Sequence, residues 1–142
     1  MRLRKAKHTD LLKLPEDMRT ALYASGVVPV VDQFDELWGH EEDILLLAGS
    51  YGSGKSFFAV DDLIAKCVEW PYFRCYYGRK VFDTVRGSIF ATIVEQIEFH
   101  GIAHEFNYSK ADNSSMIITH KPTGNKFIPF GADKIDKLKS VK

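Results

Sequence analysis

A glycine-rich stretch in the first half of this 142-residue chain has the residue types of a loop that binds phosphate. Its glycines permit backbone conformations that side chains forbid, so that successive amide N–H groups can turn toward an anion. A helix beginning near Lys55 would add the partial positive charge of its N-terminus to the same site. The stretch consists of Gly49, Ser50, Tyr51, Gly52, Ser53, Gly54, Lys55 and Ser56.

The last two residues of this loop carry the groups that would contact a nucleotide through their side chains. Lys55 can reach the β- and γ-phosphates of a nucleoside triphosphate, and the Ser56 hydroxyl can bind Mg²⁺. The surroundings agree, because an apolar run precedes the loop at 44–48 and an amphipathic helix is expected after it. The sequence therefore predicts a nucleotide site at residues 49–56.

Several classes of enzyme contain such a loop. No Asn-Lys-x-Asp element for reading guanine follows it, which argues against a GTPase. Kinases of small metabolites usually place the loop close to their N-terminus, whereas residues 1–43 precede the apolar run here. This layout favours an ATPase motor over a small P-loop kinase. A non-enzymatic module that holds nucleotide without hydrolysing it is the alternative from another class.

The elements around the loop alternate between helices and strands. The run at 44–48 suits a strand of a parallel sheet, buried on both faces. Pro15 predicts the start of a helix that ends at Gly26, and Thr84 predicts the cap of a helix that ends before Gly101. This alternation predicts an α/β layered domain with at least partly parallel strands. The other predicted elements are a helix from the loop to Pro71, strands at 73–78 and 104–108, and a hairpin of 116–120 and 126–128 turned by 122–125.

Composition narrows the class of protein. Hydrophobic residues make up 45% of the chain, and 19 basic residues balance 19 acidic ones, so that any binding of DNA by a single copy is expected to be weak. No apolar run approaches the roughly 20 residues of a membrane span, and the N-terminus lacks a secretory signal. Cys67 and Cys75 form no disulfide framework. We expect a soluble cytoplasmic protein with no membrane partner.

The segments that follow the loop resemble a known family. Arg79-Lys80, followed by Thr84 to Phe90, is similar to the large terminase subunit of tailed phages, of the group found in phages and prophages of Gram-positive bacteria. Together with the loop, the resemblance covers roughly residues 44–141. The other matching segments are His104–Phe106, the hairpin at 117–126 and the ending Lys137–Ser140.

The resemblance implies a P-loop NTPase of the ASCE/RecA-like type, a three-layer α/β sandwich with a β-hairpin near the end of this portion. Residues 1–43 would form a helical or linker segment, and 44–142 an incomplete ATPase core. The family's acidic Walker B strand, which holds Mg²⁺ and activates water, and its nuclease domain would come after residue 142. We therefore expect the chain to bind ATP and Mg²⁺ but to hydrolyse ATP poorly or not at all.

The resemblance also implies partners and further site residues. Large terminases pump double-stranded DNA into procapsids in the host cytoplasm, acting with a portal protein and a small terminase subunit, and a ring of copies is compatible with this. Arg79 and Arg86 are candidates for sensing the γ-phosphate, for acting in the active site of a neighbouring subunit, or for contacting DNA phosphate, because guanidinium groups suit phosphate oxygens. The alternative is an ordinary strand end and a solvated helix position.

Three aromatic residues remain to be placed. Phe34 and Trp38, upstream of the loop, either stack on adenine or pack in the core. Tyr51 stands where many terminases have an arginine, so any role of that arginine would be absent here or supplied elsewhere.

An incomplete α/β domain is also expected to expose a sheet edge that invites self-association.

Overall fold

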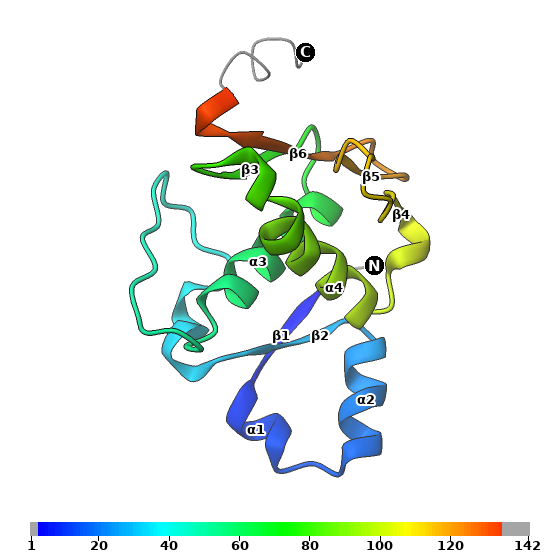
Figure 1. Ribbon diagram of the computed structural model, residues 1–142. Helices are drawn as coiled ribbons and strands as arrows, with labels where there is room; N and C mark the ends of the chain where they lie inside the picture. The colour runs from blue at the N-terminus through cyan, green and yellow to red at the C-terminus, as the bar shows by residue number, and fades with distance from the viewer. Residues whose placement is uncertain (1–2, 135–142) are drawn as a thin grey trace.

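The computed structural model describes residues 3–134 as a mixed α/β structure with two sheets (Figure 1). A two-stranded parallel sheet pairs β1 with β2, and a four-stranded sheet has the order β3-β6-β5-β4. The predicted α/β class with partly parallel strands is confirmed. The strands are β1 (Arg4–Lys7), β2 (Val27–Val30), β3 (Arg74–Arg79), β4 (Phe106–Asn107), β5 (Ile118–His120) and β6 (Lys126–Gly131), and the α-helices are α1 (His8–Leu12), α2 (Glu16–Ala24), α3 (Lys55–Glu69) and α4 (Ala91–Phe99).

The N-terminal part contains the helix that the sequence predicts and a strand pair that it does not. Helix α2 begins after Pro15, and the chain leaves it through Gly26, whose φ of 89° is the left-handed conformation that favours glycine. Strands β1 and β2 then lie side by side in parallel, with Ala6 opposite Pro29. Proline is tolerated in β2 because β2 lies at the edge of a two-stranded sheet.

The four-stranded sheet contains the predicted hairpin. Strands β5 and β6 pair antiparallel, and β6 also pairs in parallel with β3, with Cys75 beside Phe127. Helices α3 and α4 pack against each other and lie on one side of this sheet (Figure 1). The three-layer arrangement stays a prediction. The core contains Ile64 and Cys67 from α3, Ile93, Val94 and Ile97 from α4, and Cys75, Phe127, Ile118 and Phe106 from the sheet.

The helix predicted from Thr84 is three consecutive segments. A 3₁₀ turn spans Phe82–Thr84, a π-helical turn spans Arg86–Phe90, and α4 follows. The prediction that Thr84 caps the helix is wrong, because its hydroxyl donates back to the carbonyl of Val81. These segments nevertheless bury a common apolar face, in which Val85 and Ile97 are fully buried.

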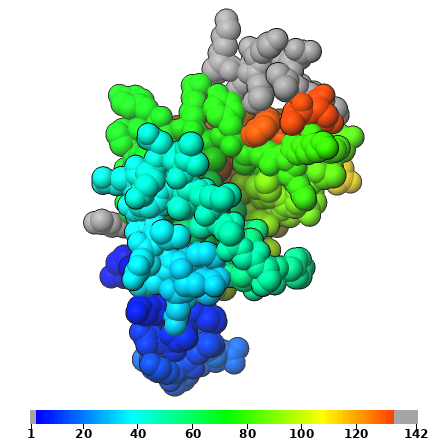
Figure 2. All heavy atoms as spheres, turned by 90° about the vertical axis from the view of Figure 1, so that its left-hand side faces the viewer, coloured from blue at the N-terminus to red at the C-terminus, as the bar shows by residue number. Residues whose placement is uncertain are grey.

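The apolar run at 44–48 forms no strand, so the prediction of a buried parallel strand is wrong. Ile44 and Leu46 are 87% and 88% exposed, and Figure 2 shows the cyan segment to which they belong lying on the surface. A strand needs a neighbour to accept its backbone hydrogen bonds, and no described strand pairs with this run. Only the partly buried Leu45 and Leu47 contact the core.

A buried asparagine joins the hairpin to the C-terminal end of α3. Asn125 Nδ2 donates to the carbonyl oxygens of Cys67 and Trp70, both at 2.7 Å, and its Oδ1 accepts the backbone N–H of Phe73 at 2.9 Å. The side chain thus satisfies carbonyl groups that the end of the helix leaves without partners. The turn between β5 and β6 is thereby fixed to the last turn of α3.

The two cysteines are free and buried. Burial raises the pKa of the Cys67 thiol to about 12 and that of the Cys75 thiol to about 11, so both are unreactive near neutral pH. The expectation of unpaired thiols is confirmed. The segment Lys137–Ser140, part of the family resemblance, lies outside the described residues.

Candidate phosphate-binding site

The glycine-rich loop leads directly into α3, as the sequence predicts. Helix α3 begins at Lys55, and its N-cap residue Gly54 has a φ of 85°. No side chain caps this end, so the first backbone N–H groups of α3 face outward with no capping oxygen. The φ of Gly54 favours glycine, and so does the space around it, because a Cβ there would lie only 2.8 Å from Cγ2 of Val31. The loop therefore leads into an uncapped helix N-terminus, the arrangement on which the predicted phosphate site depends.

The side chain of Lys55 lies within the loop. Its Nζ donates to the carbonyl oxygens of Gly49 at 2.9 Å and Ser50 at 2.7 Å, and to Oγ of Ser53 at 3.0 Å. These bonds hold an ammonium group beside the first turn of α3, where Ser56 is exposed. The positive charge, the helix N-terminus and a free hydroxyl lie together, which fits the residues predicted for a phosphate and its Mg²⁺.

The tip of the loop is open to solvent. Tyr51 is fully exposed, and Gly52 has a φ of 78° with no atom within 4 Å of an added Cβ. Tyr51, the residue that departs from the family pattern, therefore makes no packing contact that would fix the conformation of the loop.

A residue from the N-terminal part supports the loop. Gln33 Nε2 donates to the carbonyl oxygen of Ser53 at 2.8 Å. Sequence reasoning missed Gln33, because a single exposed glutamine in a 3₁₀ turn (Asp32–Leu37) has no pattern that points to a contact 20 residues away. The loop is thus supported from one side by Val31 and Gln33 and from the other by α3.

The two upstream aromatic residues pack beneath this turn. The ring centroids of Phe34 and Phe58 lie 5.3 Å apart, and Trp38 meets Phe58 edge-on at 6.5 Å. Phe34 is only 5% exposed. Of the two sequence interpretations, core packing is therefore the one that the structure bears out for Phe34.

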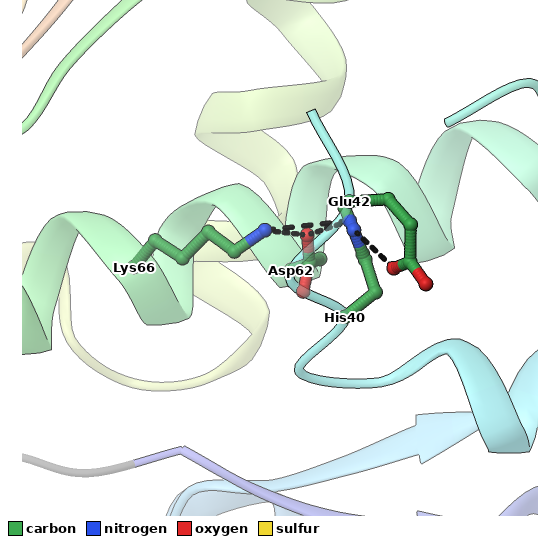
Figure 3. Close-up of polar contacts among 4 residues, drawn as sticks. All are labelled: His40, Glu42, Asp62 and Lys66. Carbon is green, nitrogen blue, oxygen red and sulfur yellow. Dashed lines mark hydrogen bonds and ion pairs between the residues drawn. The ribbon is translucent and has the colours of Figure 1, made fainter. Parts of the chain in front are cut away.

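Next along α3, Asp62 contacts a cluster of polar side chains, shown in Figure 3. Lys66 Nζ lies 2.8 Å from Asp62 Oδ2, and His40 Nε2 lies 3.3 Å from the same oxygen. Glu42 lies on the other side of His40, with its Oε2 3.7 Å from Nδ1. This cluster attaches the segment before the loop to α3.

The neighbouring carboxylate, Asp61, points to α4. His100 is fully buried, and its Nε2 lies 3.0 Å from Asp61 Oδ1. Burial raises the pKa of Asp61, and the hydrogen bond and charge of His100 oppose this only in part. Both Asp61 and Asp62 lie on α3, and both are engaged by other side chains.

The raised pKa of Asp61 predicts a pH-dependent stability. A carboxyl whose pKa is higher in the folded than in the unfolded state binds protons preferentially when folded, so stability falls as pH rises from the ordinary value of 3.8 through the raised value. The variant Asp61→Asn keeps an oxygen for His100, but it has no carboxyl to ionise, so its stability does not fall in this way as pH rises. At neutral pH it should be as stable as the wild type or more stable by about 1 kcal/mol.

Urea unfolding of both proteins from mildly acidic to neutral pH measures this difference. The advantage of Asp61→Asn should grow as pH rises. An advantage that shrinks over the same range would contradict the direction of the shift.

The two candidate arginines lie at the end of β3 and at the start of the π-helical turn. Arg79 ends β3 opposite Gly131 and is exposed. Arg86 donates to Oγ of Ser114 at 3.1 Å and to the Ser114 carbonyl at 2.6 Å, and its guanidinium lies over the ring of Phe90. None of residues 49–56 lines the cavity beside Arg86. The structure thus gives Arg86 a role in holding the segment before β5, whereas a role of Arg79 at the site stays a prediction.

The fold and the site define a mixed α/β protein in which a glycine-rich loop leads into an uncapped helix. Comparison with known proteins identifies its family. The sequence profile of the phage terminase large subunit family matches residues 41–142. The chain therefore belongs to the phage terminase large subunit family, which confirms the resemblance.

Two relatives show how much of such proteins this chain represents. The large terminase subunit of Bacillus phage SPP1 is 32% identical over 97 residues, which is 68% of this chain and 22% of that protein. The PBSX phage terminase large subunit of Bacillus subtilis strain 168 is 32% identical over 107 residues, 75% of this chain and 24% of that protein. The chain thus spans less than a quarter of either relative. Among the described residues, no helix is long and apolar enough to cross a membrane.

Proposed function

We propose that this chain is the ATP-binding portion of a phage terminase large subunit. The observation that carries the proposal is the loop at 49–56, in which the Lys55 ammonium lies beside the uncapped N-terminus of α3. Lys55 would turn from the loop carbonyls to the β- and γ-phosphates, and Ser56 would hold Mg²⁺. Bound Mg²⁺ would neutralise charge on the phosphate oxygens.

We further propose that the chain binds ATP without hydrolysing it efficiently. Hydrolysis needs a carboxylate free to orient the attacking water. The two acids on α3 nearest to the loop in sequence are occupied, Asp61 by His100 and Asp62 by Lys66 and His40. We therefore expect this chain to bind ATP but to hydrolyse it at a very low rate.

The wider proposal concerns the complete protein. Membership of the family supports a role in packaging viral DNA, with ATP as the source of energy. Double-stranded DNA, a portal protein and a small terminase subunit would be the partners, and copies would act as a ring. Within the chain itself, Arg79 is an exposed cation available to DNA phosphate or to a neighbouring copy.

Titration of the purified chain with nucleotides in the presence of Mg²⁺ tests the proposal. Calorimetry should detect binding of ATP and ADP and no binding of AMP, because the loop recognises the β-phosphate. Phosphate release should stay close to the uncatalysed rate. Absence of ATP binding would contradict the site, and sustained ATP turnover that is lost in Lys55→Ala would contradict the separation of binding from hydrolysis.

A further inference from the structure

One stripe of α3 contacts the segment that precedes the phosphate loop. Phe58, Asp62 and Lys66 follow one another at intervals of four residues and so lie on one face of the helix. Phe58 packs against Phe34 and Trp38, and the two charged residues contact His40. The chain from 34 to 40 therefore runs along α3, away from the loop and toward the middle of the helix.

Asp62 is the centre of the polar half of this contact. Its side chain is only 8% exposed, and those of Lys66 and His40 are each 13% exposed, so solvent screens the ion pair of Asp62 and Lys66 little. Figure 3 shows the Lys66 ammonium and the His40 ring converging on one carboxylate oxygen. Glu42, whose side chain is 70% exposed, contributes little.

The position of this contact defines the path of the phosphate loop. Residues 41–54 leave α3 at His40, which contacts the helix about 10 Å from its start, and return to the helix at Lys55. Most residues of the segment 41–54 are exposed, and none belongs to a strand or an α-helix. The contact at His40 therefore closes a long loop whose other end is the start of α3.

We propose that Asp62 is a positioning residue for the phosphate loop. It does not touch the nucleotide; by holding His40 it fixes the point from which residues 41–54 depart. Without the contact, this segment has more conformations in the free chain, and binding must order them at a cost in affinity. This inference rests on the proposed function, because the property affected is nucleotide affinity.

A double-mutant cycle on ATP affinity tests the proposal. His40→Ala and Asp62→Ala should each weaken binding by about tenfold, and the double variant should bind no more weakly than either single variant, since all three lose the same contact. Asp61→Asn is the matched control, because Asp61 is adjacent in sequence but faces His100; its affinity should stay within about twofold of the wild type. Effects of the two single variants that multiply to about 100-fold would overturn the proposal.

Hydrogen exchange of the nucleotide-free chain separates this inference from the proposed function. His40 lies outside every described helix, so His40→Ala leaves α3 intact. The amide of Ser53, which donates to the Ser50 carbonyl at 3.3 Å within the loop, should exchange faster in His40→Ala than in the wild type, whereas the amides of α3 should not change. Unchanged exchange at Ser53 would overturn the positioning role, even where the wild type binds ATP. If the wild type binds no ATP, the proposed function fails, and faster exchange at Ser53 still supports the contact as what holds the loop.

Discussion

Replacing Lys55 by alanine is expected to weaken binding of ATP and Mg²⁺ by about 100-fold or more. The ammonium is the side-chain cation that hydrogen bonds place inside the loop. A hydrogen bond to a charged group contributes about 1.5–3 kcal/mol, so contacts to two phosphates sum to about 3 kcal/mol, which is about two orders of magnitude in affinity. Calorimetric titration of the variant measures the loss.

Two control variants make the result specific. Lys13→Ala also removes one lysine, but from an exposed ion pair with Asp10 at the end of α1, and should leave ATP affinity unchanged. Lys55→Arg keeps the charge on a planar group that cannot fit the same loop oxygens, and should bind weakly. An alanine variant that binds within about threefold of the wild type would remove Lys55 from the site.

Replacing Asn125 by alanine is expected to lower the free energy of unfolding by about 4 kcal/mol. Asn125 is 3% exposed and makes three side-chain hydrogen bonds, to the carbonyls of Cys67 and Trp70 and from the N–H of Phe73. Loss of the buried bond to Cys67 leaves a carbonyl without a partner at a cost of about 1–3 kcal/mol, and the two part-buried bonds contribute about 1 kcal/mol each. Urea denaturation gives the difference.

Asn125→Asp tests the direction of these bonds. The aspartate retains an oxygen for the N–H of Phe73 but places a second oxygen against the carbonyls of Cys67 and Trp70, so it should be destabilised more than the alanine variant at neutral pH. Asn113→Ala, in the exposed segment before β5, should lie within about 0.5 kcal/mol of the wild type. A loss below about 1 kcal/mol for Asn125→Ala would show that the end of α3 does not depend on it.

Local signals in the sequence predicted much of the fold. Gly54 followed by a helical apolar pattern placed the start of α3, and the Pro-Thr-Gly-Asn turn placed the hairpin of β5 and β6. These elements depend on residues close together in the chain, so their types and spacing carry the information. The residue types of the phosphate loop belong to the same group, whereas its path also depends on the contacts of His40 and Gln33.

Elements that depend on distant partners could not be predicted. Strand β1 consists of Arg4, Lys5, Ala6 and Lys7, which have no apolar alternation, and it forms because β2 lies beside it. The apolar run at 44–48 has the composition of a buried strand, but strand formation depends on a neighbour as well as on the residues themselves. His40 and Gln33 support the loop through polar contacts 22 and 20 residues away, which no periodicity reveals.

The joint at Asn125 has a mechanical consequence for the phosphate loop. Helix α3 has 15 residues and is therefore about 22 Å long. The loop occupies one end, and the turn between β5 and β6 is fastened to the other. We expect a helix of this length to carry a displacement along its axis, so that a shift of the loop would also move the turn and the strands attached to it. The loop and the hairpin thus lie at the two ends of one helix, which connects them.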